Sequence, residues 1–179
     1  LYTMEISSGK ESRVTTGGTE TIRNGVLDWV YPEELDLGTA YWWSPDGRRI
    51  AFYRFDETDV PMFPIYNSRG QHGTLEHTRY PKAGDPNPKV RVGFATVGVK
   101  GVSWAGYNEE LDQYFGTPFW TPDGKSLWVQ WMNRGQDTLL LQSVDPASGA
   151  RKDIYRDTQS AWVEWIDNIH FLKDDRGFL

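Results

Sequence analysis

A ten-residue motif that occurs twice places the strongest constraint on the fold. Residues 43–52 read WSPDGRRIAF and residues 120–129 read WTPDGKSLWV. In each copy a Pro-Asp-Gly turn separates two segments rich in aromatic and aliphatic residues. Proline presets φ at the second turn position, aspartate bonds nearby backbone, and glycine accepts positive φ. The motif therefore predicts a strand, a tight turn and a second strand at both places, and a weaker third copy begins at residue 171.

A second kind of hairpin also occurs twice. Residues 1–6 turn at Ser8-Gly9-Lys10 into residues 13–15, and residues 139–144 turn at Ala147-Ser148-Gly149 into residues 151–155. Two alternating hairpins form a four-stranded antiparallel unit, which is the blade of a β-propeller. The aromatic content of 15% suits pleated sheets, and 18 glycines and 10 prolines suit tight turns. The sequence thus predicts an all-β fold, a partial β-propeller of about two to three blades.

The spacing of the motif predicts an insertion. Its copies begin at positions 43 and 120, an interval well beyond the roughly 40–50 residues that one blade needs. Residues 56–89 are polar, rich in proline and without strand alternation, so we expect them to form an arm that projects from the blade. The expected division is an outer hairpin at 1–16, a blade with the arm at 17–100, the next blade at 101–155 and the start of a further blade at 156–179.

Several classes of function are disfavoured by composition. The net charge of −6 gives no footprint for nucleic acid, and no apolar run approaches the roughly 18 residues of a membrane-spanning segment. Cysteine is absent, and no spacing of histidines and carboxylates suggests a metal. The nearest string to a G-x-S-x-G nucleophile elbow, Gly101–Gly106, is one residue too long. We therefore expect no catalytic triad, cofactor or metal site in this segment.

An acidic pair that follows an aromatic run is the main candidate site. Residues 28–31 (DWVY) predict an apolar strand that ends at Pro32, and Glu33 and Glu34 come next. Adjacent carboxylates repel each other and favour a nearby cation, and a primary ammonium offers three N–H donors to such a pair. A solvated acidic turn explains the pattern too, because residues 109–110 are a second Glu-Glu pair without an aromatic setting.

Clusters of aromatic residues leave carbohydrate binding open as an alternative. Tyr41-Trp42-Trp43, Trp128 and Trp131 could stack on sugar faces. Successive side chains of a strand point to opposite faces of the sheet, so we expect most of these rings to fill the space between blades.

Five motifs in one order resemble the N-terminal β-propeller of dipeptidyl peptidase IV and its relatives, the prolyl dipeptidyl and tripeptidyl peptidases. They are DWVYPEE at 28–34, WWSPDG at 42–47, FDETDVP at 55–61, YPKAGDPNP at 80–88 and WMNRGQD at 131–137. The first and fourth are specific, whereas S-P-D-G is common among propellers. The resemblance implies that residues 1–179 are part of the N-terminal propeller of a bacterial serine exopeptidase, and that the α/β-hydrolase domain with its Ser, Asp and His lies outside this segment.

The resemblance also implies a role for the acidic pair. Glu33 and Glu34 match the glutamates that bind the free α-amine of the peptide substrate, with Trp29 and Tyr31 supporting them. The enzyme would release di- or tripeptides after proline. Pro32 stands where some relatives carry a third glutamate, and the Phe-Arg pair that mammalian relatives have near positions 162–163 is missing here.

Partners and location follow from the same resemblance. The arm of the family packs against a partner subunit, so Val60, Pro61 and Tyr80 become candidate dimer contacts and the parent a homodimer. The parent would be periplasmic, exposed on the cell surface or secreted. A non-catalytic propeller module that binds or scaffolds other proteins is the alternative that remains.

Overall fold

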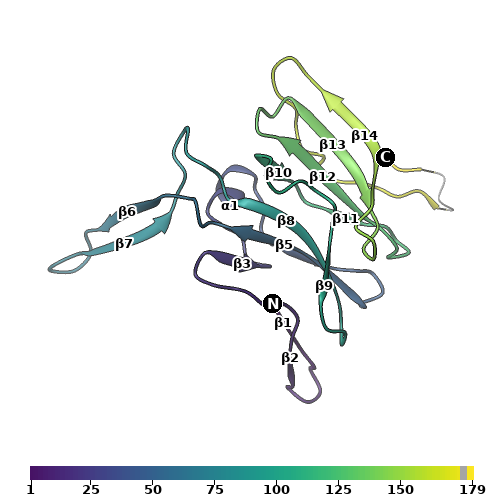
Figure 1. Cartoon of the computed structure of the whole chain (residues 1–179), viewed down its shortest axis with the longest axis horizontal. Helices are drawn as coiled ribbons and strands as arrows, with labels where there is room; N and C mark the ends of the chain where they lie inside the picture. Colours follow the sequence, from purple (N-terminus) through teal and green to yellow (C-terminus); the bar gives the residue numbers. More distant parts are fainter. Residues whose placement is uncertain (174–176) are drawn as a thin grey trace.

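The structure is a computed structural model of the chain, and it describes residues 1–173 and 177–179. Antiparallel strands form two five-stranded sheets and two separate hairpins (Figure 1). The first sheet consists of β3 (Ile22–Asn24), β4 (Tyr41–Trp43), β5 (Arg49–Asp56), β8 (Lys89–Thr96) and β9 (Val102–Trp104). The second consists of β10 (Gln113–Phe115), β11 (Phe119–Trp120), β12 (Leu127–Asn133), β13 (Thr138–Val144) and β14 (Arg151–Thr158). The hairpins are β1 (Tyr2–Met4) with β2 (Glu11–Arg13) and β6 (Met62–Asn67) with β7 (Thr74–Arg79). The predicted all-β class is confirmed.

Both sheets have the same plan. The order is β3-β5-β8-β9 in the first and β10-β12-β13-β14 in the second, with β4 and β11 paired to β5 and β12. The repeated Pro-Asp-Gly motif forms the turns β4–β5 and β11–β12, and the second kind of hairpin forms β1–β2 and β13–β14. Both predictions about hairpins are thereby confirmed.

In the first sheet the opening strand is split by an excursion. β3 and β4 lie along the same side of β5, with Arg23 opposite Phe55 and Tyr41 opposite Phe52. Between them, the Tyr53 carbonyl accepts the Gly25 N–H, and the Tyr53 N–H donates to the Ala40 carbonyl, each at 2.9 Å. Residues 26–39 therefore leave the strand and return to it at one residue of β5. They carry the only α-helix of the described chain, α1 (Val30–Glu34).

The core lies between the two sheets and includes α1. Tyr53, Phe55 and Phe115 are fully buried in it. The Tyr53 hydroxyl donates to the Gly116 carbonyl at 2.6 Å, and the Trp120 indole N–H donates to the Trp42 carbonyl at 3.1 Å. Burial of each large side chain contributes about 1.5–3 kcal/mol, so this aromatic layer fixes the two sheets against each other.

The hairpin β6–β7 forms the expected arm and extends away from the sheets (Figure 1). It leaves the sheet after β5 and returns at β8, in agreement with an insertion at 56–89. At its root, the Arg79 guanidinium donates to the Val60 carbonyl at 2.8 Å and to the Glu57 carbonyl at 3.1 Å. The Tyr80 N–H donates to the Pro61 carbonyl at 3.0 Å. These bonds hold the two strands of the arm together where they meet the sheet.

The sheets end slightly later than the divisions expected from the sequence. β9 pairs with β8, so residues 102–104 belong to the first sheet although its boundary was expected at 100. The glycine-rich turn at 98–101 joins two strands of one sheet rather than two blades. β14 extends to Thr158, beyond the expected end at 155. Beyond it the described chain has a single bridge, Phe171 to Phe178, and the third motif copy at 171–175 falls partly outside the described residues.

Candidate functional site

The strand predicted at residues 28–31 is wrong, because the segment turns into helix α1. The two carboxylate oxygens of Asp28 accept the N–H groups of Val30 at 3.1 Å and Tyr31 at 3.0 Å, which closes the turn that starts the helix. Pro32 has no N–H to lose in a first helical turn and its fixed φ suits a helix. Valine and aromatic residues favour a strand, but the bonds that the buried Asp28 carboxylate accepts from the first helical N–H groups decide the local structure.

Asp28 is a buried acid beneath the helix. Its side chain is shielded from solvent, and burial raises its pKa to about 6, although the two backbone N–H groups act in the opposite direction. Glu57 raises this pKa further and Arg23 lowers it. Arg23 forms an ion pair with Glu57 at 2.5 Å between Nε and Oε2, and the Glu57 side chain is almost completely buried. The entry to the helix therefore rests on a compact charged cluster.

Tyr31 and Trp29 anchor the helix on opposite sides. Tyr31 is 2% exposed, its ring meets Phe55 edge-on at 4.8 Å, and its hydroxyl accepts the Phe115 N–H at 3.1 Å. Trp29 meets the ring of Tyr80 edge-on, with 4.2 Å between ring centroids. Tyr31 thus joins the helix to the second sheet, whereas Trp29 joins it to the base of the arm.

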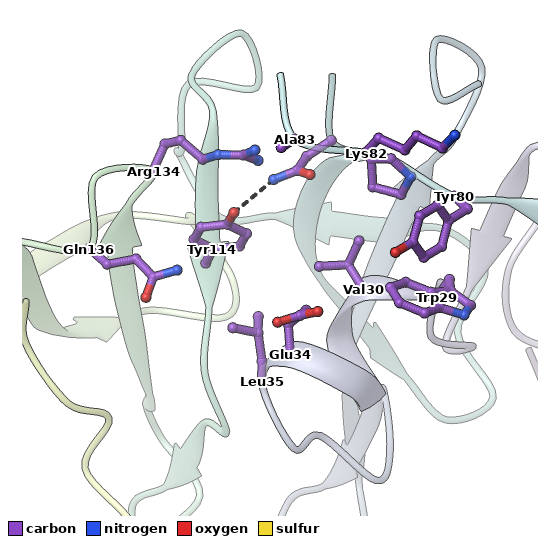
Figure 2. A pocket seen from close by; sticks show the side chains of 12 residues that line it. Trp29, Val30, Glu34, Leu35, Tyr80, Lys82, Ala83, Tyr114, Arg134 and Gln136 are labelled. Atoms are coloured by element: carbon purple, nitrogen blue, oxygen red, sulfur yellow. Dashed lines mark hydrogen bonds between the residues drawn. The ribbon is translucent and has the colours of Figure 1, made fainter. Parts of the chain in front are cut away.

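Glu33 and Glu34 are both exposed at the end of α1. Glu34 lines a pocket of about 180 Å³, and Figure 2 shows its carboxylate between Tyr114 and Arg134 on one side and Trp29 on the other. Glu33 is not part of the pocket lining. Within the described residues neither glutamate has a hydrogen bond or an ion pair through its side chain. Two adjacent carboxylates without a cation are suited to bind one.

The far wall of the pocket contains residues that the sequence did not single out. The Asn87 amide donates to the Tyr114 hydroxyl at 2.9 Å, the dashed bond in Figure 2. Burial raises the pKa of Tyr114, and the Arg134 guanidinium over its ring at 5.7 Å acts against this. Arg134 also lies 3.7 Å from Asp112. A signal was present, since Asn87 and Arg134 belong to two of the five motifs.

The residues expected in the arm lie at its root. Val60 is 2% exposed and Tyr80 is half-buried against Trp29, whereas Pro61 is exposed. The exposed apolar side chains of the arm are Met62, Ile65, Tyr66 and Leu75. A partner that binds the arm would meet these side chains before it met Val60.

The aromatic residues considered for sugar binding are dispersed. The ring of Trp128 packs edge-on against Phe171 at 4.8 Å, and the Trp131 indole donates to the Gln113 side chain at 2.6 Å. Tyr41 and Trp43 are exposed on β4 of the first sheet, whereas Trp128 and Trp131 lie on β12 of the second. Within residues 1–173 and 177–179 no three metal-ligating side chains gather, and no helix has the length and apolar character to cross a membrane.

Comparison with known proteins places this geometry in a family. The model of the "Dipeptidyl peptidase IV (DPP IV) N-terminal region" matches residues 1–179. The protein named "Probable dipeptidyl-aminopeptidase B" from Talaromyces marneffei is 33% identical over 196 residues, which cover 98% of this chain and 22% of that protein. A protein of the same name from Emericella nidulans is 33% identical and is covered to 21%.

A solved structure agrees in three dimensions. Dipeptidyl peptidase 4 from Porphyromonas gingivalis superposes with a TM-score of 0.89 at 28% identity, over 99% of this chain and 26% of that one. The chain thus spans about a fifth of the length of its curated relatives and has the fold of a DPP4 propeller region, as a partial β-propeller. Because the family model matches from the first residue to the last, the chain belongs to the dipeptidyl peptidase IV N-terminal region family.

Proposed function

We propose that this segment binds the free N-terminus of peptide substrates for a serine exopeptidase, with Glu33 and Glu34 holding the α-ammonium group. The observation that carries the proposal is that neither carboxylate has a counter-ion in the described part of the chain, while the helix that bears them is anchored on both sides. Membership of the peptidase family supports the same reading.

The chemistry of the pair fits an ammonium group. Its three N–H donors can satisfy both carboxylates at once through charge-assisted hydrogen bonds. A fixed amine also sets which carbonyl of the substrate reaches the nucleophile, so the pair measures length from the N-terminus. An acylated amine leaves two carboxylates without their cation, and blocked peptides are therefore rejected.

The remaining parts of the activity belong to the parent protein. We propose that its α/β-hydrolase domain supplies Ser, Asp and His, and that it releases di- or tripeptides after proline. The names of the relatives support an aminopeptidase that removes dipeptides. We also propose that the parent is bacterial, that it acts outside the cytoplasm, and that it dimerises through the arm.

The test uses the full-length parent and one chromogenic X-Pro peptide with either a free or an acetylated amino group. We expect cleavage of the free form alone, and a loss of roughly 10- to 100-fold in kcat/KM in Glu33→Gln and Glu34→Gln, since a charged hydrogen bond contributes about 1.5–3 kcal/mol. Glu110→Gln, at an exposed glutamate that pairs with Lys89, is the matched control with normal kcat/KM.

Two outcomes contradict the proposal. Equal cleavage of both peptides would reduce the pair to a solvated acidic turn. No cleavage of either would favour a propeller that binds or scaffolds without hydrolysis.

A further inference from the structure

The root of the arm supports the helix that bears the acidic pair. We infer that Tyr80 is a positioning residue, which holds α1 in the orientation that amine binding requires. This inference rests on the proposed function of Glu33 and Glu34, and it assigns to the arm a role inside its own chain.

Tyr80 is placed between the arm and the helix. Its ring meets Trp29, the residue that precedes α1, edge-on at 4.2 Å. On the arm side it lies 5.5 Å from the ring of Phe63, and its N–H donates to the Pro61 carbonyl. Figure 2 shows Tyr80 directly beside Trp29 at the edge of the pocket that Glu34 enters. An aromatic chain therefore runs from β6 through Tyr80 to the start of the helix.

A polar connection runs parallel to this aromatic one. The Glu57 carbonyl accepts a bond from Arg79 at the arm root, while the Glu57 carboxylate pairs with Arg23. Arg23 in turn donates to the Leu27 carbonyl at 3.4 Å, two residues before Trp29. The entry to the helix is thus fixed to the arm root by side chains of two different kinds.

The helix needs these contacts because it is too short to be stable without them. A helix of five residues is far below the about 12–15 residues at which isolated helices become stable. Tyr31 fixes one side to the second sheet, and the Trp29–Tyr80 contact fixes the other. Without Tyr80 the helix can rotate about Tyr31, and a displaced acidic pair then binds the substrate amine less tightly, which raises KM.

The experiment measures KM and kcat of the full-length parent for a free-amine X-Pro peptide. Tyr80→Ala is expected to raise KM about three- to tenfold, in line with the energy of one aromatic pair, and to leave kcat within about twofold. Tyr80→Phe keeps the ring and should show the wild-type KM, because the Tyr80 hydroxyl has no hydrogen bond within residues 1–173 and 177–179. His77→Ala, at an exposed position of β7 three residues before Tyr80, is the control. Tyr80→Leu removes the aromatic ring but keeps an apolar side chain, and it replaces Tyr80→Ala in the assay if the alanine variant does not fold.

Hydrolysis of p-nitrophenyl acetate reports on the nucleophile without using the amine site, and it should be unchanged in all variants. A normal KM in both Tyr80→Ala and Tyr80→Leu, or a parallel loss of ester hydrolysis, would overturn the inference. If Glu34→Gln raises KM while the Tyr80 variants do not, only the positioning role fails. If Glu34→Gln leaves KM unchanged in the same assay, the proposed function fails and the inference with it.

Discussion

Protonation of Asp28 should stabilise the fold, which is the reverse of what most carboxylates do. Burial raises its pKa from 3.8 to about 6 in the folded protein. The folded state therefore binds this proton more tightly than the unfolded state does. The contribution is absent above about pH 6, grows as the pH falls through the folded pKa, and is complete below the unfolded value near 3.8. One pKa unit corresponds to 1.36 kcal/mol, so the shift amounts to about 3 kcal/mol.

The perturbation that isolates this contribution is Asp28→Asn, which keeps the shape and one acceptor for the helix N–H groups but does not titrate. Denaturant unfolding of the parent, followed by tryptophan fluorescence between pH 7 and pH 4, gives the free energy of unfolding of both proteins. We expect wild type to gain on the order of 3 kcal/mol relative to Asp28→Asn as the pH falls across this range. Asp167→Asn, at an exposed site, should follow wild type. Parallel profiles of wild type and Asp28→Asn would refute the reasoning.

Further predictions concern packing around the helix and the turns. Tyr31→Phe should lower the free energy of unfolding by about 1–3 kcal/mol, because the buried Phe115 N–H loses its acceptor; denaturant titration measures this. Gly149→Ala should cost more than about 3 kcal/mol, since its Cβ would lie 2.1 Å from the Trp104 carbonyl oxygen. Gly98→Ala has a similar positive φ but open space, so its cost should be only about 1 kcal/mol, and equal melting temperatures of the two alanine variants would contradict this account.

The hairpins could be predicted because their chemistry is local. Asp46 accepts the Arg48 N–H and the Ser44 hydroxyl, and Asp123 repeats this with Lys125 and Thr121. Every group in these bonds lies within two residues of the aspartate. All the residues that define such a turn lie within five consecutive positions, so its two copies could be recognised without knowledge of the fold.

Helix α1 was harder to predict, because only its cap at Asp28 is local and the rest of its support comes from the packed fold. Phe115 supplies the partner of Tyr31, and Glu57 and Arg23 surround the capping Asp28. The intrinsic propensities of Val30 and Tyr31 favour a strand. Acidic residues at the site were found through their sequence motif, but the pocket wall at Tyr114 required the second sheet to be in place.

A comparison of the two sheets explains how such a site can be added at little cost to the stability of the scaffold. In the second sheet β10 and β11 are joined by three residues, with the Gly116 N–H donating to Gln130. In the first, the corresponding link is the whole excursion 26–39, yet both of its ends bond to the backbone of Tyr53 and the ladder along β5 continues. Gly25, with φ of 69°, turns the chain out of the strand. Since a longer loop adds only a slowly growing closure entropy, a helix with its own anchors can be carried at this point while the propeller strands stay in register.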